Sequence, residues 1–155
     1  MLRLNLSTFI CNPGRHFPFD FRSVGEQATG LFEDLSFRTA LEVSGDAFCQ
    51  LNTLYFKVQI RTTVEQACRR CLAPVYTTVD CYEAFTLPFR TEDHEVDLAP
   101  YVLGGITAVL NPRPLCRNDC RGLCPRCGTD LNEHPDHACP VEEEDEHQRL
   151  GDFLR

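Results

Sequence analysis

The sequence predicts an α+β fold, with a β-rich antiparallel meander, one or two short helices and a cysteine-rich segment after them. Residues 31–87 are rich in Val, Thr, Tyr and Phe and alternate between apolar and polar side chains, as strands with one buried face do. Residues 98–109 instead space their apolar side chains like one face of a helix. Seven of the ten cysteines lie in two groups between residues 68 and 139, which sets the end of the chain apart.

The expected strands follow one another through short turns. Residues 1–10 alternate loosely, which predicts a first strand that ends at Asn12-Pro13-Gly14. The same alternation predicts further strands over residues 37–43, 51–63 and 75–85. We expect a turn at Gly45-Asp46, whereas residues 11–30 mix aromatic and turn residues and are assigned to no element.

One helix is expected after the strands. Asp97 is a good cap for a helix over residues 98–109, because its carboxylate can accept a hydrogen bond from the first turn. Gly104-Gly105 lowers the helix propensity by about 1 kcal/mol per glycine, and Pro112 ends the helix. A second short helix over the last residues, 149–154, is expected to dock on the body.

The distribution of charge separates two parts of the chain. Residues 1–111 are expected to form a β-rich body with a CxxC knuckle and one helix, and residues 112–155 a cysteine-rich segment with an acidic tail. The formal net charge is −8, but residues 112–128 carry four arginines and one aspartate. Such a protein will not coat nucleic acid non-specifically, so any contact with nucleic acid must be local.

The sequence favours a reducing compartment. It has no run of about 18 apolar residues, and its first residues lack the features of a signal peptide, so we expect a cytoplasmic protein with no membrane partner. Thiols stay reduced there, and clustered cysteines then favour metal over disulfides. Cys11, Cys49 and Cys81 lie apart in strand-like stretches and are expected to be free, buried cysteines.

Two CxxC elements carry the prediction of a metal site. They are Cys68-Arg69-Arg70-Cys71 and Cys124-Pro125-Arg126-Cys127. Such a turn holds two thiolates at a separation that suits tetrahedral zinc, and Gly128 after the second element allows the positive φ with which the chain turns away. Zinc prefers four Cys or His ligands in closed structural sites, so we predict one or two structural zinc ions and a C-terminal zinc-knuckle segment.

The number of sites depends on how the ligands are divided. Seven thiols exceed one tetrahedral site, and two sites need a histidine as the eighth ligand. One partition gives the first site Cys68, Cys71, Cys116 and Cys120, and the second site Cys124, Cys127, Cys139 and His137. The rival partition joins the two CxxC elements in one site and leaves the other cysteines spare. His134 is the alternative histidine ligand.

The same cysteines are also compatible with two catalytic functions, thiol redox catalysis and catalysis by zinc. Neighbouring arginines can lower the pKa of a CxxC thiol, as in thiol oxidoreductases, but a thioredoxin-like motif expects one CxxC beside a βαβ pattern. Catalytic zinc needs an open coordination position, which this many thiols would fill. We therefore predict that the chain is not an enzyme and takes no small-molecule substrate.

Basic side chains accompany the cysteine elements. The chain has fourteen arginines and one lysine, and six of the arginines lie in or beside these elements: Arg69, Arg70, Arg113, Arg117, Arg121 and Arg126. If metal gathers the segments, the arginines converge on a face that suits phosphates and stacked bases, and thus RNA. The alternative is that they balance charge, because zinc with four thiolates leaves about −2 at the site.

The cysteine block resembles a known family. The stretch LCRNDCRGLCPRCGTDLNEHPDHAC, preceded by CRRCLAPV and DLAPYVLGGI, resembles the YceD-like family of large ribosomal RNA subunit accumulation proteins of bacteria and plastids. The resemblance covers about residues 35–155. Its most specific parts are Cys68-x2-Cys71-Leu72, Leu115-Cys116, Gly122-Leu123-Cys124-Pro125, Cys127-Gly128 and Leu131-Asn132, and Arg149-Leu150 fits the short terminal helix of the family.

The resemblance implies a non-enzymatic role in the accumulation or maturation of 23S rRNA, and thus in large-subunit biogenesis. It implies 23S rRNA or a large-subunit ribosomal protein as the partner. Family members often combine CxxC with a later Cys-x3-Cys pair, which favours the first partition. Many also end the second cluster with Cys-x-Cys, whereas Val141 stands there in this chain, so the fourth position would pass to His137. A protein–protein adaptor that never touches RNA and a thiol redox protein remain the alternatives.

Overall fold

The structure, a computed structural model, describes residues 2–23, 35–90 and 92–139. In this part of the chain, a long antiparallel sheet dominates. Its strands are β2 (Phe17–Ser23), β3 (Ser36–Phe37), β4 (Leu41–Gln50), β5 (Thr53–Ala67) and β6 (Pro74–Pro88). The order is β2-β4-β5-β6, and β3 pairs with β5 beyond the end of β4. The predicted antiparallel, β-rich architecture with few helices is confirmed.

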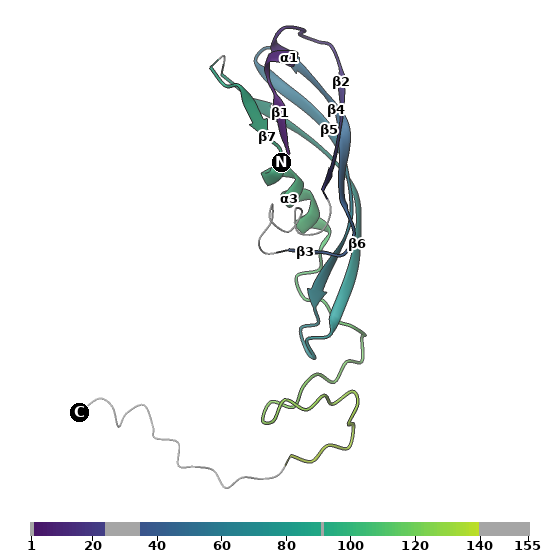
Figure 1. Cartoon of the computed structure of the whole chain (residues 1–155). Helices are drawn as coiled ribbons and strands as arrows, with labels where there is room; N and C mark the ends of the chain where they lie inside the picture. The colour runs from purple at the N-terminus through teal and green to yellow at the C-terminus, as the bar shows by residue number, and fades with distance from the viewer. Residues whose placement is uncertain (1, 24–34, 91, 140–155) are drawn as a thin grey trace, which may run out of the picture.

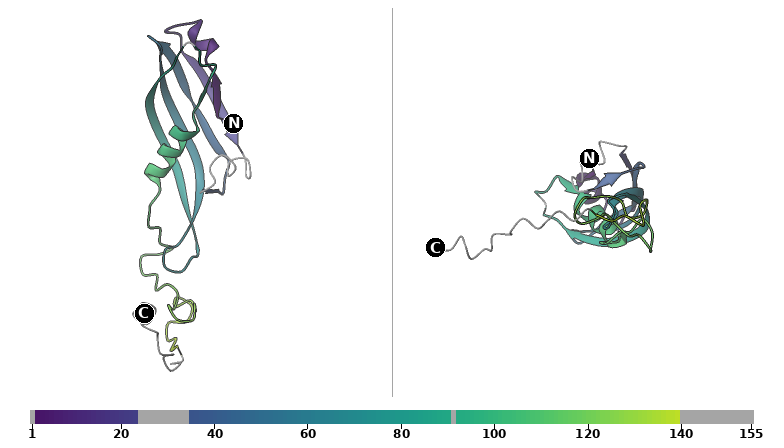
Figure 2. Two further views of the ribbon diagram at one scale, coloured as in Figure 1. Left: turned by 90° about the vertical axis from the view of Figure 1, so that its left-hand side faces the viewer. Right: turned by 90° about the horizontal axis from the view of Figure 1, so that it is seen from below.

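A second layer covers one face of this sheet. It contains α1 (Ser7–Ile10), α3 (Ala99–Val109) and a two-stranded ribbon of β1 (Arg3–Asn5) and β7 (Glu95–Asp97). Figures 1 and 2 show α3 lying across the same face that β1 and β7 approach. The core lies between the layers, with Leu2, Leu6, Leu98, Val102 and Ile106 on one side and the alternate apolar residues of β4 and β5 on the other.

The helix packs closely on the sheet because a glycine faces it. A Cβ at Gly105 would lie 2.8 Å from Cδ1 of Ile60 and 2.9 Å from Cγ of Glu83. The glycine that weakens the helix in isolation therefore permits its close approach to β5 and β6. The backbone N–H of Ala99 donates to Oδ1 of Asp97 at 2.9 Å, so Asp97 does support the first turn of the predicted helix.

The β5–β6 hairpin positions the cysteine elements. Its two strands pair without interruption from Thr53 opposite Pro88 to Ala67 opposite Pro74. The first CxxC forms the turn that joins them. The cysteine segment after α3 returns to this turn, where the N–H of Arg69 donates to the carbonyl of Pro114 at 2.9 Å. Figure 1 shows this segment below the sheet, as an extension of its long axis.

Several local predictions were wrong. Gly45 and Asp46 lie inside β4, opposite Val58 and Lys57, because the apolar alternation continues to Cys49. The turn is at Leu51-Asn52, whose positive φ values of 49° and 57° suit a tight hairpin. Within residues 2–10, the described part of the predicted first strand, Arg3–Asn5 form the short β1 before the chain turns into α1.

Two strands were missed. β2 lies within residues 11–30, where Pro18 and turn residues hide the alternation, and it pairs with β4 over its whole length. β7 has three residues, and its partner β1 is at the other end of the body in sequence. The predicted helix over residues 149–154 lies outside the described residues.

The three isolated cysteines have different surroundings. Cys49 is buried, as predicted, and Cys81 is half-buried with its thiol 3.8 Å from the carbonyl of Gly105. Cys11 is exposed, so the prediction that it is buried was wrong. It follows α1 instead of lying in a strand, and the apolar face of that turn is filled by Phe9.

Candidate metal centre

The structure brings the eight candidate ligands together in two groups. Cys68, Cys71, Cys116 and Cys120 form cluster 1, and Cys124, Cys127, His137 and Cys139 form cluster 2. Within each group, one ligand atom per residue lies within 4.8 Å of every other. These are the groups of the first partition, whereas the rival partition would mix the two. Each cluster could therefore hold a metal ion.

Cluster 1 joins two distant segments of the chain. The first two cysteines come from the β5–β6 turn, and Cys116 and Cys120 come from the segment after α3. The Sγ atoms of Cys68 and Cys120 are 3.9 Å apart, and those of Cys71 and Cys116 are 3.5 Å apart. A tetrahedron of sulfurs about 2.3 Å from zinc has edges of about 3.8 Å. The distances fit a shared ion and are too long for disulfides, whose S–S bond is about 2.05 Å.

The two CxxC turns have the same backbone geometry. In the first, the N–H of Leu72 donates to the carbonyl of Cys68 at 2.9 Å, and in the second Gly128 donates to Cys124 at 2.9 Å. The residue after each turn has a positive φ, 63° at Leu72 and 76° at Gly128. The positive φ predicted for Gly128 is confirmed. At Leu72 the same conformation is taken by a residue that disfavours it.

The thiols of cluster 1 differ in acidity. The backbone N–H groups of Cys71 and Arg70 stabilise the thiolate of Cys68 and lower its pKa to about 6, against the effect of burial. The hydrogen bond with the thiol of Cys71, together with burial, raises the pKa of Cys116 to about 12. Without a cation the four sulfurs must share protons, because four adjacent thiolates would repel one another. A bound metal ion would replace those protons.

Cluster 2 is local in sequence and less buried. Nε2 of His137 lies 3.2 Å from Sγ of Cys127. The hydroxyl and the backbone N–H of Thr129 lower the pKa of Cys127 to about 6. Burial, followed by the neighbouring thiol of Cys127, raises the pKa of Cys139 to about 11. Of the four ligands only Cys124 is buried, and Cys127 is exposed. His134 belongs to neither cluster.

The two clusters are connected through Gly122. The N–H of Leu123 donates to the carbonyl of Arg70 at 3.0 Å, so the chain between the clusters pairs with the first knuckle. Gly122 has a φ of +82°, and a Cβ there would lie 2.9 Å from the carbonyl oxygen of Arg70. Only glycine therefore fits this junction without displacing the first knuckle.

Asn132 also links the clusters, and reasoning on ligand types did not single it out. Its Nδ2 lies 3.5 Å from Sγ of Cys120, and its Oδ1 accepts the N–H of Arg121 at 2.8 Å. Asp130 holds this amide in place, because its Oδ1 accepts from Nδ2 of Asn132 at 2.7 Å. Hydrogen bonds of this kind orient metal ligands. The sequence does mark Asn132 in one way, because Leu131-Asn132 is among the most specific parts of the resemblance to the YceD-like family.

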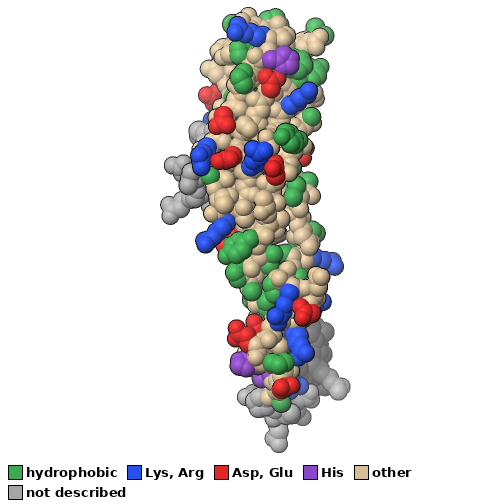
Figure 3. Space-filling view, turned by 90° about the vertical axis from the view of Figure 1, so that its right-hand side faces the viewer, with side chains coloured by type: hydrophobic (Ala, Val, Ile, Leu, Met, Phe, Trp, Pro, Cys, Tyr) green, Lys and Arg blue, Asp and Glu red, His purple; other side chains and the backbone are tan. Residues whose placement is uncertain are grey.

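The six arginines of the cysteine elements play different parts. Arg70 donates to the carbonyl of Cys120 at 2.6 Å, Arg121 donates to the carbonyl of Pro135 at 3.3 Å, and Arg117 pairs with Asp119 at 3.6 Å. Among the described residues, no hydrogen bond or ion pair involves the guanidinium of the other three, Arg69, Arg113 and Arg126. All three are exposed. Figure 3 shows several basic side chains on the lower end of the molecule, with acidic ones between them, and others along the sheet above.

Comparison with known proteins gives relatives without a described activity. The chain is 34% identical over 85 residues to uncharacterized proteins of Mycobacterium tuberculosis (strain ATCC 25618 / H37Rv) and Mycobacterium bovis, and 33% identical to one of Mycobacterium leprae. The alignments cover 45% of this chain and about two fifths of each relative, 41% or 39%. No protein-family profile matches the chain, and no solved structure is significantly similar.

In the described part of the chain, no helix is long and apolar enough to cross a bilayer.

Proposed function

We propose that the chain is a non-enzymatic factor in large-subunit ribosome biogenesis, in which two structural zinc ions shape an arginine-bearing surface that contacts 23S rRNA. The proposal rests on the meeting of the two ligand clusters, at one end of the molecule, with three exposed arginines whose guanidinium groups make no hydrogen bond or ion pair with the described residues. The resemblance to the YceD-like family supplies the identity of the RNA.

Zinc suits both ligand sets. Tetrahedral sites with four sulfurs take zinc or iron, and replacement of one thiolate by imidazole fits zinc. All eight positions are protein side chains, so no coordination position is left for a substrate, which argues for a structural ion. His137 and Cys139 complete the second set although the family's final Cys-x-Cys is absent. Metal analysis of protein purified without added metal should give two zinc ions per chain.

The arginines suit RNA more than simple charge balance. If they only neutralised thiolates, their guanidinium groups would face the sulfurs. Instead, Arg70 and Arg121 bind backbone carbonyls, and Arg69, Arg113 and Arg126 make no contact with the sulfurs in the described residues. Exposed guanidinium groups can pair with phosphates and stack on unpaired bases. The contact is local, in agreement with the net charge of −8.

A binding experiment tests this proposal. Binding of 23S rRNA fragments to zinc-loaded protein should weaken with salt, and replacing Arg69, Arg113 and Arg126 by Gln should lower the slope of log K against log salt by about 2 to 3. The matched control replaces Arg3, Arg22 and Arg90, three exposed arginines of the body that pair with Glu95, Glu42 and Glu92. Equal losses in both variants, or no salt dependence, would contradict the proposal.

A protein partner is the second candidate, and Leu72 favours it. This side chain is 65% exposed on the first knuckle although its backbone has a positive φ. Non-glycine residues held at a positive φ often lie at functional sites, where the strain has a role. Capture of a large-subunit ribosomal protein that survives nuclease treatment and is lost in Leu72→Ser would favour an adaptor over an RNA-binding factor.

A further inference from the structure

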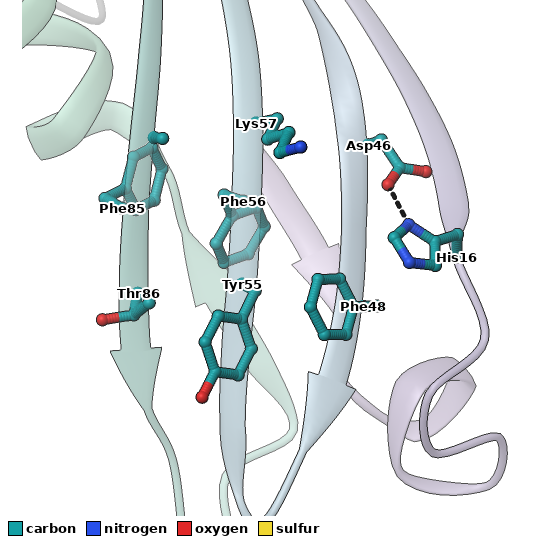
Figure 4. A pocket seen from close by; sticks show the side chains of 9 residues that line it. His16, Asp46, Phe48, Tyr55, Phe56, Lys57, Phe85 and Thr86 are labelled. Atoms are coloured by element: carbon teal, nitrogen blue, oxygen red, sulfur yellow. Dashed lines mark hydrogen bonds and ion pairs between the residues drawn. The ribbon is translucent and has the colours of Figure 1, made fainter.

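A pocket lies on the outer face of the sheet, opposite the layer that contains α3. It has a volume of about 450 Å³, and its lining includes His16, Phe48, Tyr55, Lys57, Ala84 and Thr86. These residues come from β4, β5, β6 and the residue before β2, so the sheet itself forms the floor (Figure 4). None of them belongs to the metal clusters.

Three stacked rings form one wall of this pocket. The ring of His16 stacks on Phe48 at a centroid distance of 4.5 Å, and Phe48 stacks on Tyr55 at 4.8 Å with an interplanar angle of 8°. The pair of His16 with the carboxylate of Asp46 fixes the far end of this outer row. The row runs across the strands and stops at β5. On β6 the residue opposite Tyr55 is Thr86, and the residue opposite Lys57 is Ala84, both too small to continue the stack.

The inner face carries a similar row, and there the fold completes it. Phe56, the neighbour of Tyr55 on β5, stacks on Phe85 of β6 at 4.9 Å. Phe85 in turn stacks on Tyr101 of α3 at 4.5 Å and 9°. The inner row therefore extends over β6 and ends on a ring supplied by the helix. The outer row, at the same level of the sheet, ends beside open space.

Polar groups surround the end of the outer row. Tyr55 is 36% exposed, and its hydroxyl and that of Thr86 can bond the edge of a planar ligand. Lys57 is the one lysine of the chain, it is exposed, and its ammonium makes no ion pair with the described residues. By contrast, the basic residues farther along this face are paired, Arg22 with Glu42 and Arg61 with Asp80.

We infer that this pocket binds a nucleotide, with the base stacked on Tyr55 over Ala84 and Thr86 and a phosphate against Lys57. A nucleobase is planar, has polar edges and is attached to an anion, and the pocket offers a partner for each of these features. An aromatic side chain of a protein would fill the stack but would supply no anion for Lys57, whose neighbour on β4, Asp46, pairs with His16. The nucleotide can belong to single-stranded RNA or be free. The inference does not depend on the metal centre or on its arginines.

Titration of the full-length, zinc-loaded protein tests the inference. The probes are a 12-nucleotide single-stranded RNA of mixed sequence and, separately, AMP and UMP. Binding is followed by NMR of the Tyr55 and Phe48 ring resonances, which the arginine surface does not affect, and by anisotropy of labelled RNA. We expect these resonances to shift, and Tyr55→Leu to weaken RNA binding by roughly 10- to 100-fold, as loss of one stacked base does. Saturation by the mononucleotides at similar concentration identifies a free nucleotide as the ligand.

Two further variants test the stacking position and the phosphate contact separately. Thr86→Phe should place a ring on Tyr55 where the base would stack, leave the thermal stability unchanged or raised, and abolish the ring shifts. Lys57→Gln should weaken binding and lower the salt slope by about 1. Tyr82→Leu is the matched control, because Tyr82 is a 76% exposed tyrosine of β6 outside the pocket, and it should bind like wild type.

Two results would overturn the inference. One is the absence of shifts in the Tyr55 and Phe48 resonances at saturating RNA, even if the arginine surface binds. The other is an aromatic peptide that shifts these resonances as strongly as RNA and is indifferent to Lys57→Gln, which would assign the pocket to a protein side chain. If replacing Arg69, Arg113 and Arg126 by Gln leaves the salt slope unchanged while the pocket variants still weaken binding, the proposed function is contradicted and the pocket inference stands.

Discussion

The two candidate metal clusters contain CxxC turns of the same geometry but connect different parts of the chain. Cluster 1 draws its ligands from segments 45 to 52 residues apart, and three of its four cysteines are buried. Cluster 2 draws all of its ligands from residues 124–139 and leaves Cys127 exposed. The first cluster therefore belongs to the tertiary structure of the body, whereas the second folds a short loop that rests on the first.

Cluster 2 depends on cluster 1 more than cluster 1 depends on cluster 2. Cluster 1 packs with Val75 and Leu115, so if it holds the proposed ion, removal of that ion is expected to free the cysteine segment from the sheet. Cluster 2 meets the rest of the molecule through the pairing of Leu123 with Arg70 and the contact of Asn132 with Cys120. Loss of cluster 1 should disturb both sites, while loss of cluster 2 should leave the body as it is.

The largest expected effect separates the two clusters directly. Cys68→Ser should lower the zinc content from two ions to one or none and lower Tm by about 10 °C, because the ion closes a long loop and structural zinc contributes folding free energy. Cys127→Ser should lose one ion and shift Tm by only a few degrees. Metal analysis and calorimetry of both variants measure this.

Limited proteolysis gives the control for that pair. Cleavage after residue 111 should accelerate in Cys68→Ser, whereas in Cys127→Ser new cleavage should stay within residues 121–139. Equal destabilisation by the two substitutions would show that the clusters unfold as a single cooperative unit, and would contradict the expectation that the body stays folded without cluster 2.

A glycine pair tests the junction with a smaller expected effect. Gly128→Ala should destabilise by about 1 kcal/mol, since its φ of 76° is strained for alanine but nothing lies within 4 Å of the new Cβ. Gly122→Ala adds a clash with the carbonyl oxygen of Arg70 to the same strain, so its cost should be at least twice as large. Urea denaturation of the zinc-loaded variants measures both. Similar losses of unfolding free energy in the two variants would mean that the backbone at Gly122 can move away from Arg70, and that cluster 2 is not packed against the first knuckle.

The smallest effect has the opposite sign. Leu72→Gly should stabilise the folded protein by about 0.5 kcal/mol. Glycine removes the backbone strain of the positive φ, and this gain exceeds the stabilisation of the unfolded chain by its greater entropy. Little is lost with the side chain, because it is mostly exposed. The two knuckles would then end in the same residue. Denaturation curves of wild type and variant recorded side by side resolve this difference. A loss of stability would show that the Leu72 side chain packs in the folded state.

The sequence predicted the long strands β5 and β6, the helix α3 and the CxxC turns. The alternation over β5 and β6 and the spacing of α3 mark them because each element buries one face against the core. The observed grouping of the eight ligand candidates was one of two partitions that the spacing allowed, and the resemblance to the YceD-like family favoured it. Their occupancy by zinc and the role in ribosome biogenesis stay predictions.

What could not be predicted depends on contacts between distant residues. β7 is three residues long and exists because β1 pairs with it, and β2 is held by β4 despite Pro18. Asn132 acts on Cys120 only through the folded junction. The stacked row of His16, Phe48 and Tyr55 comes from three different strands or their ends, so no pattern along the chain marks it.

The length of strand β5 has a further consequence. Tyr55, at the proposed nucleotide pocket, and Cys68, in the first knuckle, lie near opposite ends of this one strand and its turn. At about 3.3 Å per residue, the strand holds the two proposed contacts about 40 Å apart. A mononucleotide could reach only one of them, whereas a single RNA strand long enough to reach both would bind bivalently. Once one end of such a strand is bound, binding of the other end would be intramolecular, so the protein would bind RNA strands long enough to reach both contacts more tightly than shorter ones.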